Sequence, residues 1–196
     1  RFFSPYNNNA LADPRVVKHV QDGRHFVETT QKKYDVIISE PPNIWVSGVS
    51  QLFTDEFYRS AKKRLKKGGI LTQWSPAYEL DTVDLKLILA TIQGRFEHVM
   101  YWTNNVDFLI VASDKPIVPD YEYVAALMDV PEIHKSLDQI IKGIDAVVMM
   151  KILANPAVGP DAMPALLKDT RRINRDNLPY LEFKTARNIF NNSRKK

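Results

Sequence analysis

The chain has 196 residues, a formal net charge of +4, 44% hydrophobic residues and 26% charged residues. This composition is typical of a globular protein that can bury a core, and the length allows one domain or one domain with an appendage. The absence of cysteine excludes disulfides and thiol chemistry. No apolar run approaches the ~18 residues of a membrane span, so we expect this segment to make no membrane contact and to be cytoplasmic.

Two basic runs, KKRLKK at 62–67 and the terminal residues 194–196, give the chain its positive charge. Such runs can bind nucleic acid. Neither run has an interleaved aromatic residue as a base-stacking platform, and cations also complement the end of a helix. We therefore interpret both as solvated surface and expect no nucleic-acid partner.

Strands alternate with amphipathic helices through the first 118 residues. The central strand, 34–39, is a β-branched apolar run that we expect to be buried on both faces. The other expected elements are a strand at 16–20, a helix at 24–30, a helix that Thr54 caps and Gly68-Gly69 ends, a strand at 70–74, a helix at 81–93, and antiparallel strands at 99–102 and 108–112. This order predicts an α/β fold with a mostly parallel, doubly wound sheet.

The composition changes near residue 119. Helical segments at 121–128, 144–153 and 163–168 are separated by prolines at 131, 156, 160 and 164. We expect residues 119–196 to form a helical appendage on the same domain as residues 1–118.

Glu40 is the strongest candidate for chemistry. It ends the central strand, and Pro41-Pro42 stops further strand pairing. Ligands bind at the carboxyl ends of strands in open α/β sheets, and a fixed carboxylate there can take a proton from an attacking amine. The alternative is a carboxylate that only caps the strand, but the two prolines favour the functional interpretation because they fix its direction.

Asp22-Gly23 follows another expected strand, so its carboxylate is predicted to face the same crevice and to accept a hydrogen bond from an amine such as that of adenine. An ordinary Asp-Gly turn explains the same residues equally well. Several aromatic residues also lie at strand ends, where they can surround a cation or complete the rim of the core: Trp45, Trp74, Tyr78, Tyr101 and Trp102.

Other chemistries find little support in the sequence. The four histidines show no metal-ligand spacing, so we expect no metal. Residues 47–50 (SGVS) do not match the nucleophile elbow, and no phosphate-binding GxxxxGK[ST] motif is present.

Five segments together resemble a known family: DPRV (13–16), DGR (22–24), YDVIISEPPNIWVSGVSQLFTDEFY (34–58), LKKGGILTQW (65–74) and LPYLEF (178–183). They are similar to the polyamine aminopropyltransferases, the spermidine/spermine synthases, and in particular to a bacterial branch that is often fused to membrane segments. The resemblance implies the fold of S-adenosylmethionine-dependent methyltransferases. It also implies transfer of an aminopropyl group from decarboxylated S-adenosylmethionine to a polyamine amine, by a homodimer.

The resemblance assigns roles to individual residues. Glu40 matches the catalytic carboxylate, which is usually Asp. Asp22 matches the acidic residue that holds the adenine amine, and Gly23 and Pro41 are expected beside the same ligand. Asn43, Gln73, Trp74 and Tyr78 fall in the region that binds the polyamine, and the loop 45–52 matches the turn that closes over the S-adenosyl ligand.

The departures from the family pattern are specific. Glu40 is one methylene longer than the usual Asp, and Asn43 replaces a second Asp that helps to bind the amine. The family's glycine-rich turn and its first two strands would precede Arg1. We therefore expect this chain alone to bind S-adenosyl ligands weakly or not at all, and methylthioadenosine binding at micromolar affinity would contradict that expectation.

Two alternatives stay open from the sequence. A methyltransferase has the same fold and differs in which group leaves the sulfur, so fold does not separate the two. A non-catalytic domain that keeps the fold is favoured by Asn43 and by the missing glycine-rich segment.

Overall fold

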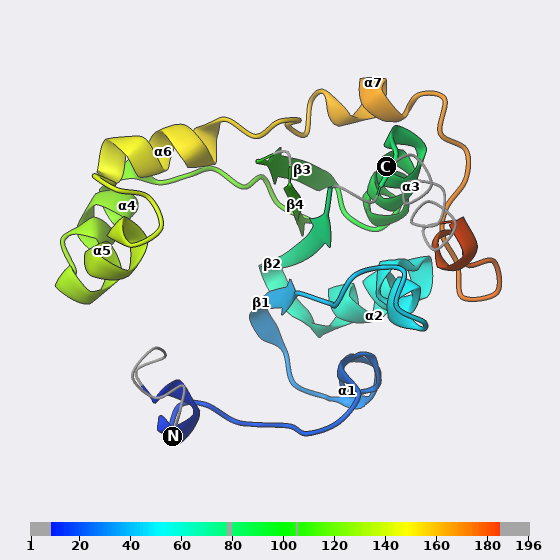
Figure 1. The fold of residues 1–196 in the computed structure, drawn as a ribbon, viewed down its shortest axis with the longest axis horizontal. Helices are drawn as coiled ribbons and strands as arrows, with labels where there is room; N and C mark the ends of the chain where they lie inside the picture. Colours follow the sequence, from blue (N-terminus) through cyan, green and yellow to red (C-terminus); the bar gives the residue numbers. More distant parts are fainter. Residues whose placement is uncertain (1–8, 78–79, 105, 185–196) are drawn as a thin grey trace, which may run out of the picture.

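A computed structural model describes residues 9–77, 80–104 and 106–184. Its centre is a sheet of four strands in the order β1-β2-β4-β3 (Figure 1). The strands are β1 (Tyr34–Ser39), β2 (Leu65–Pro76), β3 (His98–Thr103) and β4 (Asp107–Ser113). The β1/β2 pairing is parallel, whereas the β2/β4 and β3/β4 pairings are antiparallel. The α/β class and the β3/β4 hairpin are confirmed, but the sheet is mixed rather than mostly parallel.

Seven α-helices and two short 3-10 helices accompany the four strands in the described residues. They are η1 (Ala10–Ala12), α1 (Gly23–Thr29), η2 (Val49–Phe53), α2 (Asp55–Arg64), α3 (Thr82–Gln93), α4 (Tyr121–Met128), α5 (Pro131–Asp138), α6 (Ala146–Ala154) and α7 (Met163–Leu167). The start of α2 is the expected one, because the Thr54 hydroxyl accepts from the backbone N–H of Phe57. Asp81 and Asp84 form a capping box at the start of α3.

The main core lies between one face of the sheet and the helices α2 and α3. Cross-strand partners such as Leu71 and Ala112 share that face, and both are fully buried in one cluster with Phe53 and Ile88. Met163 and Leu181 belong to the same cluster, so part of the chain beyond residue 119 completes the core. The predicted boundary near residue 118 stays a prediction.

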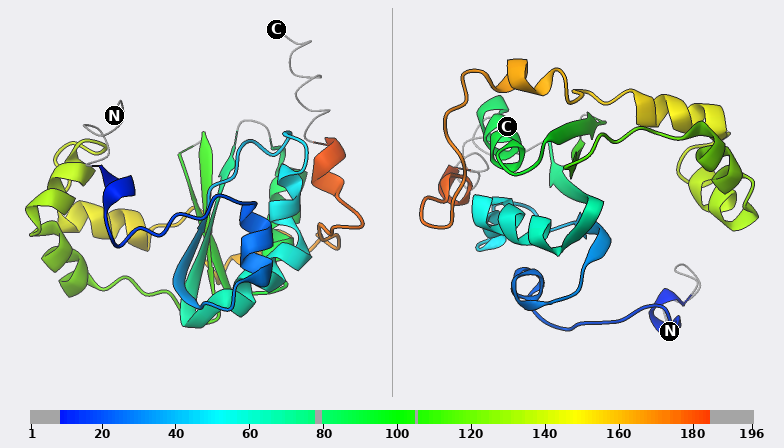
Figure 2. Two further views of the ribbon diagram at one scale, coloured as in Figure 1. Left: turned by 90° about the horizontal axis from the view of Figure 1, so that it is seen from below. Right: turned by 180° about the vertical axis from the view of Figure 1, so that it is seen from behind.

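The opposite face of the sheet is more open. Val36 and Ile38 project from it and are 48% and 73% exposed. The helices α4, α5 and α6 stand beside the sheet and pack around a separate apolar cluster that contains Val124 and Ile144 (Figure 2). Among the described residues, helices therefore do not cover both faces as a doubly wound sheet requires.

Two strand predictions are wrong for related reasons. Residues 16–20 are not a strand, because within the described chain they pair with no neighbouring strand; Val17 and Val20 are exposed. The strand β1 pairs only with β2, so it is an edge strand and is not buried on both faces. A β-branched run indicates a strand, but it does not fix how many sides are covered.

Gly68-Gly69 does not end the helix as predicted. The helix α2 stops at Arg64, and both glycines lie within β2. The pairing with β1 is irregular there, and Gly68 has a φ of 76°, which is typical of a β-bulge. A Cβ on Gly69 would lie 3.0 Å from the carbonyl oxygen of Asp35. The glycines are therefore needed for the bulge and for close strand pairing.

The helices beyond residue 119 largely agree with the prediction. Among the described helices α4 to α7, α5 was missed, because Pro131 was interpreted as a break between helices. It occupies the first turn of α5 instead, where a proline has no hydrogen bond to lose. No helix in the described ranges is long and apolar enough to cross a membrane.

Candidate active site

The carboxyl ends of β1 and β2 lie at one edge of the sheet, because these two strands are parallel. Ser39 pairs in register with Gln73, so Glu40 follows at the position of Trp74. Asp107, at the start of β4, pairs with Pro76 at the same edge. The fold therefore places Glu40 and Trp74 at the same end of the sheet, where the sequence predicted a site.

Glu40 is exposed, whereas Pro41 directly after it is buried. The buried proline fixes the turn that follows β1. The apolar surroundings expected for Glu40 are not found, because β1 is an edge strand and its neighbours Val36 and Ile38 are themselves exposed. The candidate base is therefore open to solvent.

Gln73 and Trp74 point to opposite faces of the sheet, as neighbours in a strand must. Gln73 is fully buried on the core side, and its side-chain amide lies 3.3 Å from the carbonyl oxygen of Trp74. Trp74 lies on the open face and is half-buried. Of these two, only Trp74 is placed to wall a pocket on the open face.

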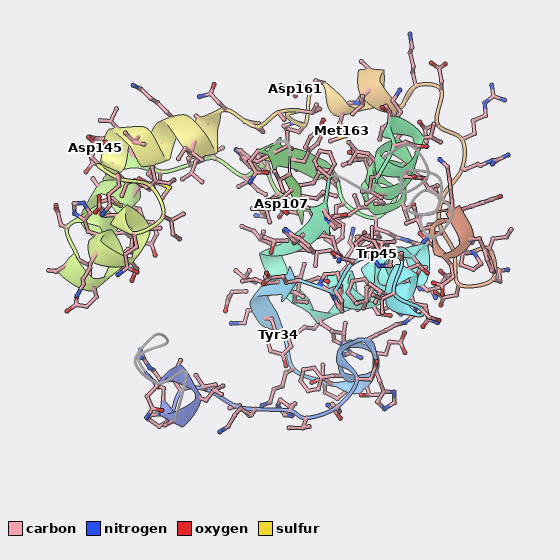
Figure 3. All side chains as sticks on the ribbon, in the orientation of Figure 1. Tyr34, Trp45, Asp107, Asp145, Asp161 and Met163 are labelled. Atoms are coloured by element: carbon pink, nitrogen blue, oxygen red, sulfur yellow. The ribbon has the colours of Figure 1, made fainter. Side chains whose placement is uncertain are left out.

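Asp107 orients Trp74 and was not singled out from the sequence. Its carboxylate accepts from the indole Nε1 of Trp74 at 3.2 Å. The side-chain oxygen of Asn104 in turn accepts from the backbone N–H of Asp107 at 2.7 Å. Figure 3 shows Asp107 within the sheet. No sequence signal pairs these residues, because the contact depends on the β2/β4 register.

Asp22 caps the helix α1. Its Oδ1 accepts from the backbone N–H of His25 at 2.7 Å, which is a structural role that the sequence did not separate from ligand binding. It also lines a hollow of about 460 Å³ together with Arg24, Gln51 and Asp176. No atom lies within 4 Å of a Cβ built on Gly23, so there is room beside this turn.

Arg24 connects α1 to two distant segments. Its guanidinium donates to the carbonyl oxygen of Gln51 at 2.9 Å and to the carboxylate of Asp176 at 2.9 Å. The hydrogen bond from Arg24 lowers the pKa of Asp176, although partial burial opposes this effect. One wall of the hollow is therefore fixed by an ion pair.

The loop between Glu40 and α2 carries Asn43, Trp45 and η2. The carbonyl oxygen of Asn43 accepts from the N–H of Val46 at 3.0 Å, and both Asn43 and Trp45 are half-buried. Figure 3 shows Trp45 on the side of the sheet where α2 lies. The loop is in contact with the C-terminal segment through Glu182, which accepts from Gly48 N–H at 3.1 Å.

The remaining aromatic candidates make contacts elsewhere in the fold or lie outside the described residues. Tyr78 lies outside the described residues. Tyr101 packs edge-on against Phe108, with 5.5 Å between ring centroids. Trp102 donates from Nε1 to the carbonyl oxygen of Ile152 at 2.8 Å, so it anchors α6. Within the described ranges, no group of three or more potential ligands could hold a metal ion.

The fold resembles those of solved spermidine synthases. The structure of spermidine synthase from Thermotoga maritima matches with a TM-score of 0.56 and 20% identity, over 87% of this chain and 55% of that chain. A spermidine synthase in complex with the transition-state analogue AdoDATO matches with a TM-score of 0.52 and 20% identity, over the same shares of the two chains. These likenesses define the class of fold.

Sequence comparison identifies the family. Residues 1–115 match the model of the spermine/spermidine synthase domain. The polyamine aminopropyltransferase of Buchnera aphidicola from Schizaphis graminum is 31% identical over 102 residues, which are 52% of this chain and 35% of that protein. That of Clostridium perfringens strain SM101 is 42% identical over 81 residues, 40% of this chain and 28% of that protein. The chain belongs to the spermine/spermidine synthase family, and it matches about a third of the length of these relatives.

Proposed function

We propose that this chain carries part of the active site of a polyamine aminopropyltransferase, which uses decarboxylated S-adenosylmethionine as co-substrate. Family membership supports the transferase class. The observation that carries the proposal is the meeting of Glu40 and Trp74 at the carboxyl edge of β1 and β2, since ligands of open α/β sheets bind at this edge.

The proposed reaction is a direct displacement. Glu40 takes a proton from the attacking amine, and the nitrogen lone pair forms a bond to the methylene carbon beside the sulfonium. The carbon–sulfur bond breaks, and its electron pair stays on sulfur as methylthioadenosine leaves. The sulfonium is already a good leaving group, so the contribution of the protein is positioning and deprotonation.

The proposal assigns the S-adenosyl ligand to the α1 side of the site. Asp22 lines the hollow there and would accept from the adenine amine, with Gly23 and Pro41 beside the same ligand. The amine substrate would lie against Trp74, whose electron-rich ring attracts a cation, and near Asn43 and Tyr78, whereas Gln73 is buried on the core side of the sheet. We also propose the homodimer that the family resemblance implies.

The exposure of Glu40 bears directly on this mechanism. A carboxylate that is exposed to water is a weaker base than one from which water has been excluded. In the proposal, the bound ligands displace water from Glu40 and thereby strengthen it as a base.

Two observations favour a second candidate, a domain that keeps the fold without the chemistry. Glu40 is exposed, and Asn43 stands where the family resemblance implies an acidic residue. A protein of this kind would bind neither co-substrate productively.

The test is a comparison of two co-substrates with the full-length protein. We expect methylthioadenosine to be released from decarboxylated S-adenosylmethionine in the presence of an aliphatic diamine, with no methylated product from S-adenosylmethionine. Methyl transfer would support the methyltransferase alternative, and no turnover with either co-substrate would support the non-catalytic domain. Mass spectrometry of the amine product separates these outcomes.

A further inference from the structure

The loop that follows the candidate base is held by a residue more than 130 positions away. The carboxylate of Glu182 accepts from the backbone N–H of Gly48 at 3.1 Å and from the hydroxyl of Ser47 at 3.4 Å. Its second oxygen accepts from the hydroxyl of Ser50. Three donors from one short segment of loop therefore converge on a single side chain.

Asn174 reinforces the same connection. Its side-chain amide lies 3.4 Å from the carbonyl oxygen of Ser50 and 3.2 Å from that of Phe53. Its own backbone oxygen accepts from the N–H of Asp55 at 2.9 Å. The C-terminal segment thus binds the loop at both ends of η2, and this segment lies beside the loop in Figure 1.

The loop has few means of holding this conformation alone. Gly48 has a φ of 84°, and η2 is a 3-10 helix of 5 residues, a type of helix with poor hydrogen-bond geometry. No side chain caps the start of η2. Charge-assisted hydrogen bonds are roughly twice as strong as neutral ones, so Glu182 adds a strong restraint on residues 47–50 to the burial of Val49 and Phe53 in the core.

We propose that Glu182 is a positioning residue, which holds residues 47–50 in the conformation that the S-adenosyl ligand requires. The inference rests on the proposed function, because the loop it holds leads directly from Glu40 and ends beside Gln51, which lines the hollow next to Asp22. The hydrogen bonds that the Glu182 carboxylate makes to described residues are to this loop, and its effect would reach the ligand through the backbone of residues 47–51.

The first test measures the loop without any ligand. In the full-length protein, we expect Glu182→Ala to speed amide hydrogen exchange of residues 47–50 by about tenfold or more, because charge-assisted bonds are lost. Glu182→Gln should have a smaller effect, since its carbonyl can still accept from Gly48. Exchange in β4 and the matched surface variant Glu132→Gln should stay at wild-type rates. Unchanged loop exchange in Glu182→Ala, or faster exchange in β4 as well, would overturn the proposal.

The second test links the loop to the ligand. Calorimetry with methylthioadenosine should show affinity reduced by about tenfold in Glu182→Ala and less in Glu182→Gln. The kcat at saturating co-substrate should be much less affected than KM, because Glu182 does not touch the reacting atoms. A faster-exchanging loop with unchanged affinity would overturn the positioning role. If wild-type protein binds no methylthioadenosine, the proposed function fails, whereas the exchange experiment still decides whether Glu182 holds the loop.

Discussion

Replacing Asn174 by Ala gives the sharpest stability test of the contact between the C-terminal segment and the loop. Asn174 is fully buried, and its side-chain amide is the donor to two carbonyl oxygens, those of Ser50 and Phe53. Each lost hydrogen bond costs about 1 kcal/mol, and a buried acceptor left unpaired costs about 1–3 kcal/mol. The backbone bonds of residue 174 remain, so we expect a loss of about 2–3 kcal/mol in the free energy of unfolding.

Urea denaturation followed by circular dichroism measures this loss. With a slope of about 2–3 kcal/mol per molar urea, the midpoint should fall by about 1 M. The matched control is Asn155→Ala, because that exposed amide donates locally, to the carbonyl oxygen of Lys151, and the substitution should change stability by less than about 0.5 kcal/mol. Equal effects of the two substitutions would refute the reasoning.

Three further predictions concern the bulge, the ion pair and the aromatic wall. Gly68→Ala should lower the free energy of unfolding by roughly 1–2 kcal/mol in urea titration, because residue 68 has a positive φ. The control Gly159→Ala, at a position without a positive φ, should lower the free energy of unfolding by less. Equal losses would contradict the assignment of a bulge at Gly68. Because Arg24 lowers the pKa of Asp176 in the folded chain, the ion pair stabilises the fold above the ordinary value of 3.8 and this contribution is lost as pH falls below it. Thermal melts at a series of pH values should show less acid dependence in Asp176→Asn, and an unchanged dependence would contradict the assignment. In steady-state kinetics of the full-length protein, Trp74→Ala should raise the KM for the amine about tenfold, and Trp74→Phe should raise it less. An unchanged KM would show that Trp74 does not bind the amine.

Much of the local structure was predictable because its signals lie close together in the sequence. Thr54 and Asp81 mark the starts of α2 and α3 through their own side-chain hydrogen bonds. The short connection between β3 and β4 requires an antiparallel hairpin. Phe57 and Ala61 are buried as the helical period predicted.

The errors came from features that depend on distant neighbours. The apolar run of β1 indicated a strand, but its edge position follows from which strands pair with it. Gly68 could end a helix or form a bulge, and only the pairing with β1 decides between them. Pro131 similarly could separate two helices or begin one.

The position of Glu40 and Trp74 at one end of the sheet was predictable from the sequence, but their contacts were not. The resemblance located Glu40 and Trp74, and the fold brings them to one edge of the sheet. The resemblance could not reveal that Asp107 orients Trp74, or that Glu182 within LPYLEF binds the loop of residues 47–50. These contacts join residues far apart in the sequence, and no local pattern encodes them.

The rate of the Glu40→Gln variant of the full-length protein tests the central claim most directly. If Glu40 is the general base, kcat for methylthioadenosine release should fall by about 10²-fold or more. The affinity for methylthioadenosine should stay within about threefold of wild type, because the S-adenosyl ligand is held by other residues. A variant that turns over at the wild-type rate would show that Glu40 accepts no proton in the reaction, and the proposed mechanism would then be wrong.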